Sequence, residues 1–362
     1  MEQSRSRIHI GQTWGGPDVT AFFERDVILP LTHRGSDVFL DIDMDGGETQ
    51  LSVNGEPLQG LDHFRSLVPL GNFANSDDVL QLKLEAFVIN YPYDARRNDE
   101  RDEHVFKRAN IVIADRVVEA CYFDMTWVFN AYMHLWESDE NIDLEGLFLR
   151  HLEEACRILG PSFSCQEEAR KDGAAAAGSY LREHVMDSDA FRHSGVINLC
   201  AHSHLDLVYL WPIKETFRKN GRTVSNALSL LREYPDFVFS QSQPYLYEKL
   251  QIHYPTLFSQ VKDLIAAGRW EVVGAMYVEP DGNLPGPESW VRQIMFGKRY
   301  LANELATDSR ICWLPDVFGV MYTLPQILKK AGIDYFLTAK TQHLERYHSV
   351  PLRFFSLARA RW

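Results

Sequence analysis

The sequence has few cysteines, no long apolar run and no excess of positive charge, and each shortage excludes a class of protein. Its five cysteines among 362 residues show no C-x-x-C spacing, so neither a disulfide framework nor a zinc finger fits. No stretch of about 18 uncharged apolar residues occurs, and residues 1–7 lack the apolar segment of a signal peptide. The net charge of −13 is a poor match for phosphate-backbone binding, which depends on lysine and arginine. We therefore expect an acidic cytoplasmic protein with no nucleic-acid and no membrane partner.

Residues 1–140 show the period-two alternation that is typical of antiparallel strands with one solvated face. In the segment 38–45 apolar residues alternate with three aspartates, and alternation returns over 80–88. The pair Asn54 and Gly55 between such segments is a strong hairpin signal. We therefore predict an N-terminal β-sandwich over residues 1–140.

The three aspartates of this segment, Asp41, Asp43 and Asp45, also match the opening of an EF-hand calcium loop. The twelfth position of that loop would be Ser52 instead of glutamate, and the flanking residues alternate as strands. We interpret the aspartates as the solvated face of a hairpin. We interpret the aromatic-rich run 121–136 as part of a hydrophobic core.

Residues 141–192 change to helical spacing. Four apolar residues between 149 and 159 fall on one helical stripe, which Gly160 and Pro161 end. The segment 171–178 holds two glycines and four alanines, which predicts a flexible boundary. We therefore expect a helical linker between two domains.

In residues 193–340 short apolar segments alternate with helical stripes, which is typical of parallel βαβ units. One of the helices has Thr223 as its candidate N-cap and ends before Pro235. The expected strands lie at 196–201, 237–240, 270–276, 311–314 and 335–338. The other expected helices contain 257–265, 287–301 and 323–331. This pattern predicts a parallel sheet whose functional groups lie at the carboxyl ends of the strands.

Imidazole and carboxylate groups follow several of these strands. His204 and Asp206 come after the first strand, Glu279 and Asp281 after the third, and Asp316 after the fourth. A lone His-x-Asp pair is usually part of a solvated loop, but polar groups at equivalent strand ends weaken that interpretation. Nitrogen and carboxylate donors together suit Zn²⁺ or Co²⁺. The Glu-Pro-Asp-Gly-Asn segment around Asp281 is also a good turn sequence.

Five motifs in this region resemble, in order and spacing, those of the glycoside hydrolase family 38 α-mannosidases of the cytosolic and bacterial type. The motifs are 201–216 (AHSHLDLVYLWPIKET), 268–274 (GRWEVVG), 278–285 (VEPDGNLP), 313–319 (WLPDVFG) and 324–328 (LPQIL). The resemblance implies a multidomain β plus α/β protein, in which residues 193–340 form the N-terminal part of a (β/α)₇ catalytic barrel. It also implies hydrolysis of terminal α-linked mannose in oligosaccharides with retention of configuration.

The resemblance implies roles for single residues. His204, Asp206 and Asp316 match the ligands of a zinc or cobalt ion, and Asp316 also matches the catalytic nucleophile. For substrate binding, the implied residues are Tyr209, Glu279, Asp281 and Lys340. The oligomeric state is left open, a homo-oligomer included.

The resemblance ends at Lys340. The remaining segment, 341–362, carries four arginines and one glutamate, and its histidines His343 and His348 are not nominated as ligands. The family's acid/base carboxylate and its fourth metal ligand are expected beyond Trp362, so we expect a chain truncated within the catalytic domain and of low activity. Two other interpretations stay open: a metal-dependent polysaccharide deacetylase-like barrel and a carbohydrate-binding remnant that lacks turnover.

Overall fold

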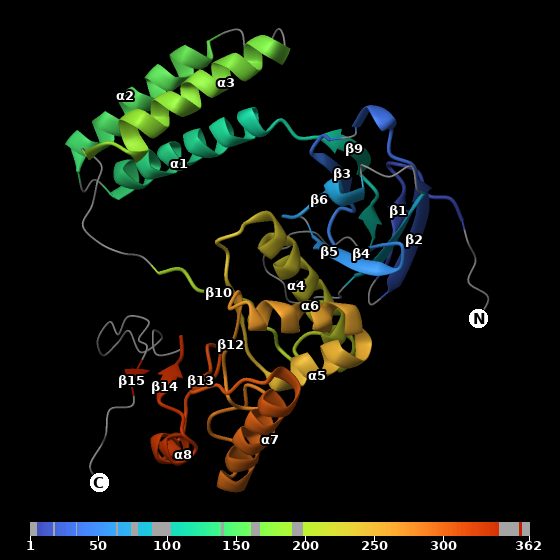
Figure 1. Cartoon of the computed structure of the whole chain (residues 1–362), viewed down its shortest axis with the longest axis vertical. Helices are drawn as coiled ribbons and strands as arrows, with labels where there is room; N and C mark the ends of the chain where they lie inside the picture. Colours follow the sequence, from blue (N-terminus) through green and yellow to red (C-terminus); the bar gives the residue numbers. More distant parts are fainter. Residues whose placement is uncertain are drawn as a thin grey trace.

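The computed structural model describes residues 6–16, 19–33, 35–62, 64–73, 79–88, 103–138, 141–160, 167–189 and 198–339, and the strand Phe355–Ser356. Figure 1 shows the order of the chain, from the N-terminal sheets through three long helices to an α/β region. Within the described residues, every helix is too short or too polar to cross a membrane. The predicted substrate-binding Lys340 and the basic tail, apart from the strand just named, lie outside these residues.

Antiparallel strands make up the first part of the chain, as its alternation predicted. The strands are β1 (Thr13–Trp14), β2 (Thr20–Val27), β3 (Val38–Asp43), β4 (Glu48–Val53), β5 (Glu56–Leu61), β6 (Leu67–Pro69), β7 (Leu80–Phe87), β8 (His104–Val105) and β9 (Arg108–Ile113). One sheet has the order β2-β7-β4-β5, a second has the order β6-β3-β9, and β1 pairs with β8. The chain therefore begins with two antiparallel sheets and a small ribbon.

The two larger sheets contribute to one hydrophobic core. Leu40 of β3 and Val68 of β6 pack in the same buried cluster as Leu51 of β4. The hairpin between β4 and β5 turns at Asn54 and Gly55, which both have positive φ, as a type I′ turn requires. The alternation thus directs one set of side chains into a shared interior and leaves the other set facing outward.

The expectation of β structure through residue 140 is wrong after β9. A 23-residue helix, α1 (Arg116–Ser138), occupies the aromatic-rich run. Its inward positions recur every three or four residues, which is helical spacing and not strand spacing. These positions are Val118, Cys121, Met125, Val128, Tyr132 and Leu135. Several aromatic residues of the run, including Trp127 and Trp136, remain exposed and therefore obscure this stripe in the sequence.

The expectation of a flexible boundary at 171–178 is also wrong. The segment lies inside α3 (Glu167–Leu181), which continues as a π-helical turn over Arg182–Met186. With α2 (Ile142–Leu159) and α1 it forms a three-helix bundle, in which each helix packs against the other two (Figure 1). Alanine is the strongest helix former, and a Cβ on Gly173 would lie 3.1 Å from the carbonyl oxygen of Leu159. Small residues here allow close helix packing.

The α/β region contains the expected alternation. Its strands are β10 (Ala201–His202), β11 (Phe239–Gln241), β12 (Trp270–Val272), β13 (Ile311–Trp313) and β14 (Tyr335–Leu337). Its helices are α4 (Ile213–Glu233), α5 (Pro244–His253), α6 (Pro255–Ala266), α7 (Pro287–Leu305) and α8 (Leu324–Lys330). Strands β10, β11 and β12 pair in parallel, and so do β13 and β14.

Within the part of the chain that the structure describes, the parallel strands do not close into the expected barrel. Within the described residues the strands form two separate sheets, and β15 (Phe355–Ser356) pairs with β14 in the antiparallel direction. One backbone hydrogen bond, from Ala275 N–H to Ile311 C=O at 2.9 Å, joins the end of β12 to β13. Of the strand expected at 196–201, the structure describes residues 198–201, and only Ala201 lies in a strand, β10.

Candidate metal and active site

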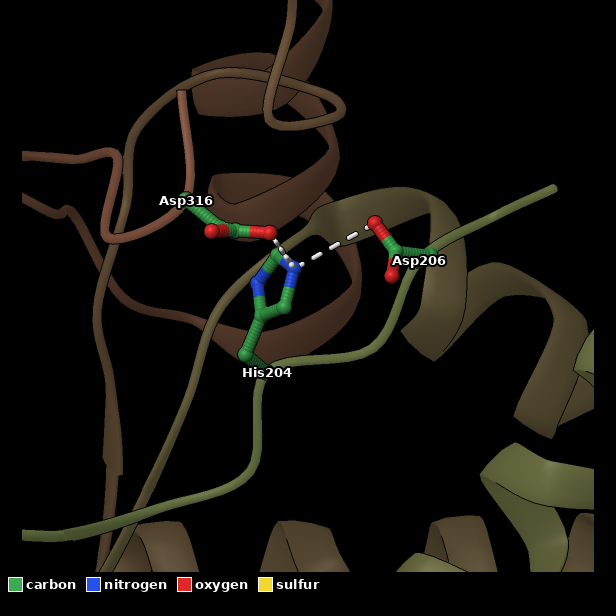
Figure 2. Close-up of side chains that lie close together, drawn as sticks. All are labelled: His204, Asp206 and Asp316. Carbon is green, nitrogen blue, oxygen red and sulfur yellow. Dashed lines mark hydrogen bonds and ion pairs between the residues drawn. The ribbon is translucent and has the colours of Figure 1, made fainter. Parts of the chain in front are cut away.

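Two loops at the carboxyl ends of strands bring three predicted residues together. His204 and Asp206 follow β10, and Asp316 follows β13. One ligand atom of each side chain lies within 4.8 Å of the others (Figure 2). Parallel strands place their carboxyl ends at one edge of a sheet, and the hydrogen bond from Ala275 to Ile311 joins the sheet of β10 to that of β13. Residues more than 100 positions apart in the chain can therefore meet here.

The geometry of the cluster centres on one nitrogen of His204. Its Nε2 atom lies 3.4 Å from Oδ1 of Asp206 and 3.6 Å from Oδ2 of Asp316. All three side chains are partly exposed, so the cluster is open to solvent. One imidazole nitrogen and two carboxylate oxygens are a donor set that zinc and cobalt accept. The residues present therefore fit the metal ion that the sequence predicted and would supply three ligands to it.

The other nitrogen of His204 faces a buried carboxylate. Its Nδ1 atom lies 2.9 Å from Oε2 of Glu279, whose side chain is 6% exposed. The Glu279 carboxylate raises the pKa of His204, while burial opposes this change. The negative charges of Asp206 and Asp316 also raise the pKa of His204, by less than Glu279 does.

Sequence reasoning did not nominate the polar residues behind Glu279. Ser242 donates a hydrogen bond of 2.5 Å to Oε1 of Glu279, and the Nε2 atom of His202 lies 3.2 Å from the same hydroxyl oxygen. Burial lowers the pKa of His202 to about 4, and the nearby His204 contributes to this shift. The available signal was the His-x-His spacing that begins at the last residue of β10, since side chains two apart on an extended segment share a face.

The remaining predicted substrate residues lie in different surroundings. Tyr209 is exposed and packs edge-on against Trp211. The carboxylate of Asp281 accepts hydrogen bonds from the backbone N–H groups of Asn283 and Leu284, which lower its pKa. This is the turn arrangement that the sequence also allowed. Hydroxyl binding by Asp281 or Glu279 stays a prediction.

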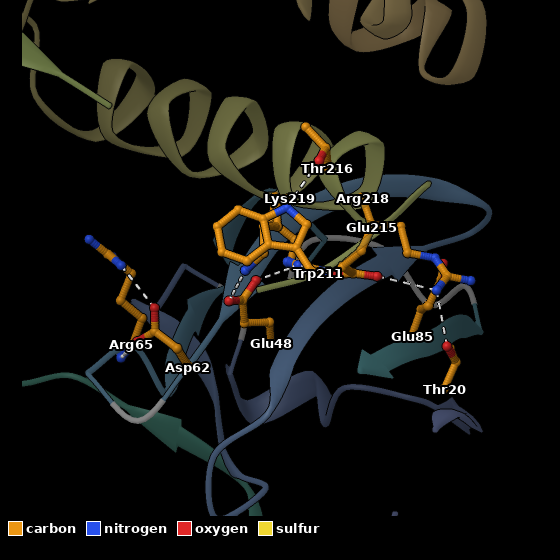
Figure 3. Close-up of polar contacts among 11 residues, drawn as sticks. Thr20, Glu48, Asp62, Arg65, Glu85, Trp211, Glu215, Thr216, Arg218 and Lys219 are labelled. Carbon is orange, nitrogen blue, oxygen red and sulfur yellow. Dashed lines mark hydrogen bonds and ion pairs between the residues drawn. The ribbon is translucent and has the colours of Figure 1, made fainter. Parts of the chain in front are cut away.

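A second charged cluster lies apart from this site, between the N-terminal sheet and α4 (Figure 3). Glu48 of β4 pairs with Lys219 and Arg222 of α4, and Arg222 also contacts Glu215 at 2.6 Å. Glu215 and Arg222 are buried. Nearby, the backbone N–H of Gly60 in β5 donates a hydrogen bond to Oδ1 of Asn226 in α4. Since these charges are paired with each other, the cluster joins two parts of the fold.

Comparison with known proteins agrees with the motifs. Residues 194–353 match the glycosyl hydrolases family 38 N-terminal domain. Alpha-mannosidase 2C1 of Mus musculus is 28% identical over 94% of this chain and 32% of its own length. Alpha-mannosidase G of Dictyostelium discoideum is 37% identical over 38% of this chain and 13% of its own. The crystal structure of an alpha-mannosidase from Enterococcus faecalis V583 shows 26% identity, a TM-score of 0.36, and coverage of 38% of this chain and 16% of that one.

The α/β region is therefore similar to a glycosidase domain. More narrowly, residues 194–353 are similar to the N-terminal domain of glycosyl hydrolases family 38, and α-mannosidases are among the proteins that this chain resembles. The chain spans about a third of the length of alpha-mannosidase 2C1.

Proposed function

We propose that the chain carries the metal-binding half of a retaining α-mannosidase active site, which removes terminal α-linked mannose from oligosaccharides. The observation that carries this proposal is the convergence of His204, Asp206 and Asp316 inside the matched domain. The proposed setting is a cytoplasmic protein whose parallel strands form part of a (β/α)₇ barrel.

In the proposed mechanism, His204, Asp206 and Asp316 hold a zinc or cobalt ion. Such an ion would act as a Lewis acid that orients and polarises the sugar hydroxyls. Asp316 is the proposed nucleophile: a carboxylate oxygen attacks the anomeric carbon, and the bond from that carbon to the leaving oxygen breaks. Tyr209 offers an exposed ring on which a sugar could stack.

A retaining hydrolase needs a second carboxyl group that protonates the leaving oxygen. Two acidic candidates near the strand ends have other partners in the structure. Glu279 faces His204 and accepts from Ser242, and Asp281 accepts from two backbone N–H groups. We therefore assign the proton donor to neither of them.

The proposal is tested by metal binding and product analysis together. We expect isothermal titration calorimetry of the purified 362-residue chain to show one Zn²⁺ or Co²⁺ site, which His204→Ala removes. Assays with an α-mannoside and with an N-acetylated polysaccharide then separate a mannosidase from the alternative deacetylase. Release of acetate would contradict the proposal, and sugar binding in a chain without metal would favour a carbohydrate-binding remnant.

A further inference from the structure

His204 presents its two ring nitrogens to different groups. Nε2 faces Asp206 and Asp316, whereas Nδ1 faces Glu279 on the other side of the ring. Nδ1 of His204 and Oε2 of Glu279 are both buried and form an ion-pair contact of 2.9 Å, and neither atom has a hydrogen bond within the described residues. The contact therefore lies behind the cluster and away from the face on which a substrate could bind.

Glu279 is itself held in place. The Ser242 hydroxyl donates to its Oε1 atom at 2.5 Å, and its backbone N–H donates to Oε1 of Gln243 at 3.3 Å. Gln243 in turn donates from Nε2 to the carbonyl oxygen of Leu205, the residue next to His204, at 2.9 Å. The carboxylate is thus fixed relative to the loop that carries His204.

The donors and acceptors of this group can be assigned. A carboxylate only accepts, so the Ser242 proton points to Glu279 and the Ser242 oxygen is left to accept from Nε2–H of His202. Nε2 of His204 also faces a carboxylate oxygen, that of Asp206 at 3.4 Å, so in the metal-free protein this nitrogen can carry a proton as well. A metal ion at Nε2 would use the lone pair of that nitrogen, so the single proton of the neutral ring would then lie on Nδ1 and point to Glu279.

We propose that Glu279 is a positioning residue, which fixes the ring and the tautomer of His204 so that Nε2 is the metal-binding atom. Carboxylates that accept from the second nitrogen of a ligating histidine have this effect in metal sites, and losing one typically weakens binding about 10- to 100-fold. The inference rests on the proposed function, because it concerns the same metal site. It replaces a hydroxyl-binding role for Glu279 with an orienting one.

The experiment measures Zn²⁺ affinity by calorimetry in the full 362-residue chain. For Glu279→Gln we expect Zn²⁺ binding weakened at least about 10-fold, with an altered visible absorption spectrum of the Co²⁺ form. Ser242→Ala removes one hydrogen bond to the carboxylate and is expected to weaken binding on the order of 2- to 10-fold. The matched control is Glu288→Gln, which removes one exposed carboxylate from the start of α7 and is expected to change neither readout.

Thermal unfolding in the presence of a chelator separates a positioning role from a structural one. We expect the metal-free melting temperatures of the wild type and Glu279→Gln to agree. Unchanged Zn²⁺ affinity and an unchanged Co²⁺ spectrum in Glu279→Gln would overturn the inference while leaving the proposed function intact. If that variant does not fold, equal affinities of Ser242→Ala and wild type overturn it. A wild-type chain that binds neither ion would overturn both proposals.

Discussion

Nδ1 of His204 lies 2.9 Å from Oε2 of Glu279, on the other side of the imidazole from Asp206 and Asp316. This relationship links a buried carboxylate on the loop after β12 to an open cluster of metal-ligand type. The His204 ring therefore contacts Glu279 through Nδ1 and faces Asp206 and Asp316 through Nε2. The following predictions test this arrangement and the fold that holds it.

The pKa values of His202 and His204 should lie far apart. Glu279 raises the pKa of His204, whereas burial lowers that of His202 to about 4. Following the histidine ring signals by NMR in metal-free protein, we expect His204 to take up its proton at a higher pH than an ordinary histidine. His202 should stay neutral until about pH 4.

The titration of His202 also affects stability. The unfolded chain binds a proton at this residue near pH 6.5, but the folded chain does not. Acidification from that pH toward 4 therefore favours unfolding through His202, and His202→Gln should reduce this loss in urea denaturation. The opposite shift of His204 contributes stability at low pH that is lost as the pH rises. A single shared transition of both histidines near pH 6.5 would contradict these assignments.

The buried charges between the N-terminal sheet and α4 should matter for folding. Arg222→Met removes the nearer of the two cations that contact Glu215, which is 1% exposed and keeps Arg218 at 3.3 Å, and should lower the free energy of unfolding by about 1.5–3 kcal/mol. Arg292→Met breaks an exposed pair with Glu288 and should change it by less than about 0.5 kcal/mol. Equal effects of the two substitutions in urea denaturation would show that this interface is not stabilised as described.

The aspartates of the N-terminal hairpin should bind no calcium. Arg108 pairs with Asp41 and lies 3.7 Å from Asp43, and Lys107 pairs with Asp45. Because these carboxylates already have cationic partners, their joint substitution by asparagine should leave the metal content of the protein unchanged. Loss of bound metal in the triple variant, measured by elemental analysis, would return the EF-hand interpretation.

The 362-residue chain should hydrolyse p-nitrophenyl α-mannoside slowly or not at all, even with added Zn²⁺ or Co²⁺. Asp316 supplies the proposed nucleophile, but Glu279 and Asp281 are both engaged by other groups. Loss of general acid catalysis alone typically costs about 10²- to 10⁴-fold in rate. Rapid release of p-nitrophenol that disappears in Asp316→Asn would refute this expectation.

The βαβ pattern predicted that polar groups at the strand ends lie near one another, and the family resemblance then singled out His204, Asp206 and Asp316 among them. The contact between His204 and Glu279 could not be predicted, since it depends on side-chain directions 75 positions apart. Helix α4 begins at Ile213, ten residues before the expected N-cap Thr223, because its first turns bury charged residues such as Glu215 and Arg222. The β4 partner of Arg222, Glu48, is distant in sequence, so the apolar stripe alone gave too short a helix. Helix α5 was not predicted at all.

The most direct measurement is Zn²⁺ binding to the wild-type chain and to His204→Ala, Asp206→Asn and Asp316→Asn. Because the three side chains converge, the account predicts one ion per wild-type chain and a large loss of affinity in each variant. The control Asp281→Asn, whose carboxylate accepts from the backbone of its own turn, should bind like the wild type. A wild-type chain without bound ion, or variants that bind as tightly as it does, would contradict the central claim.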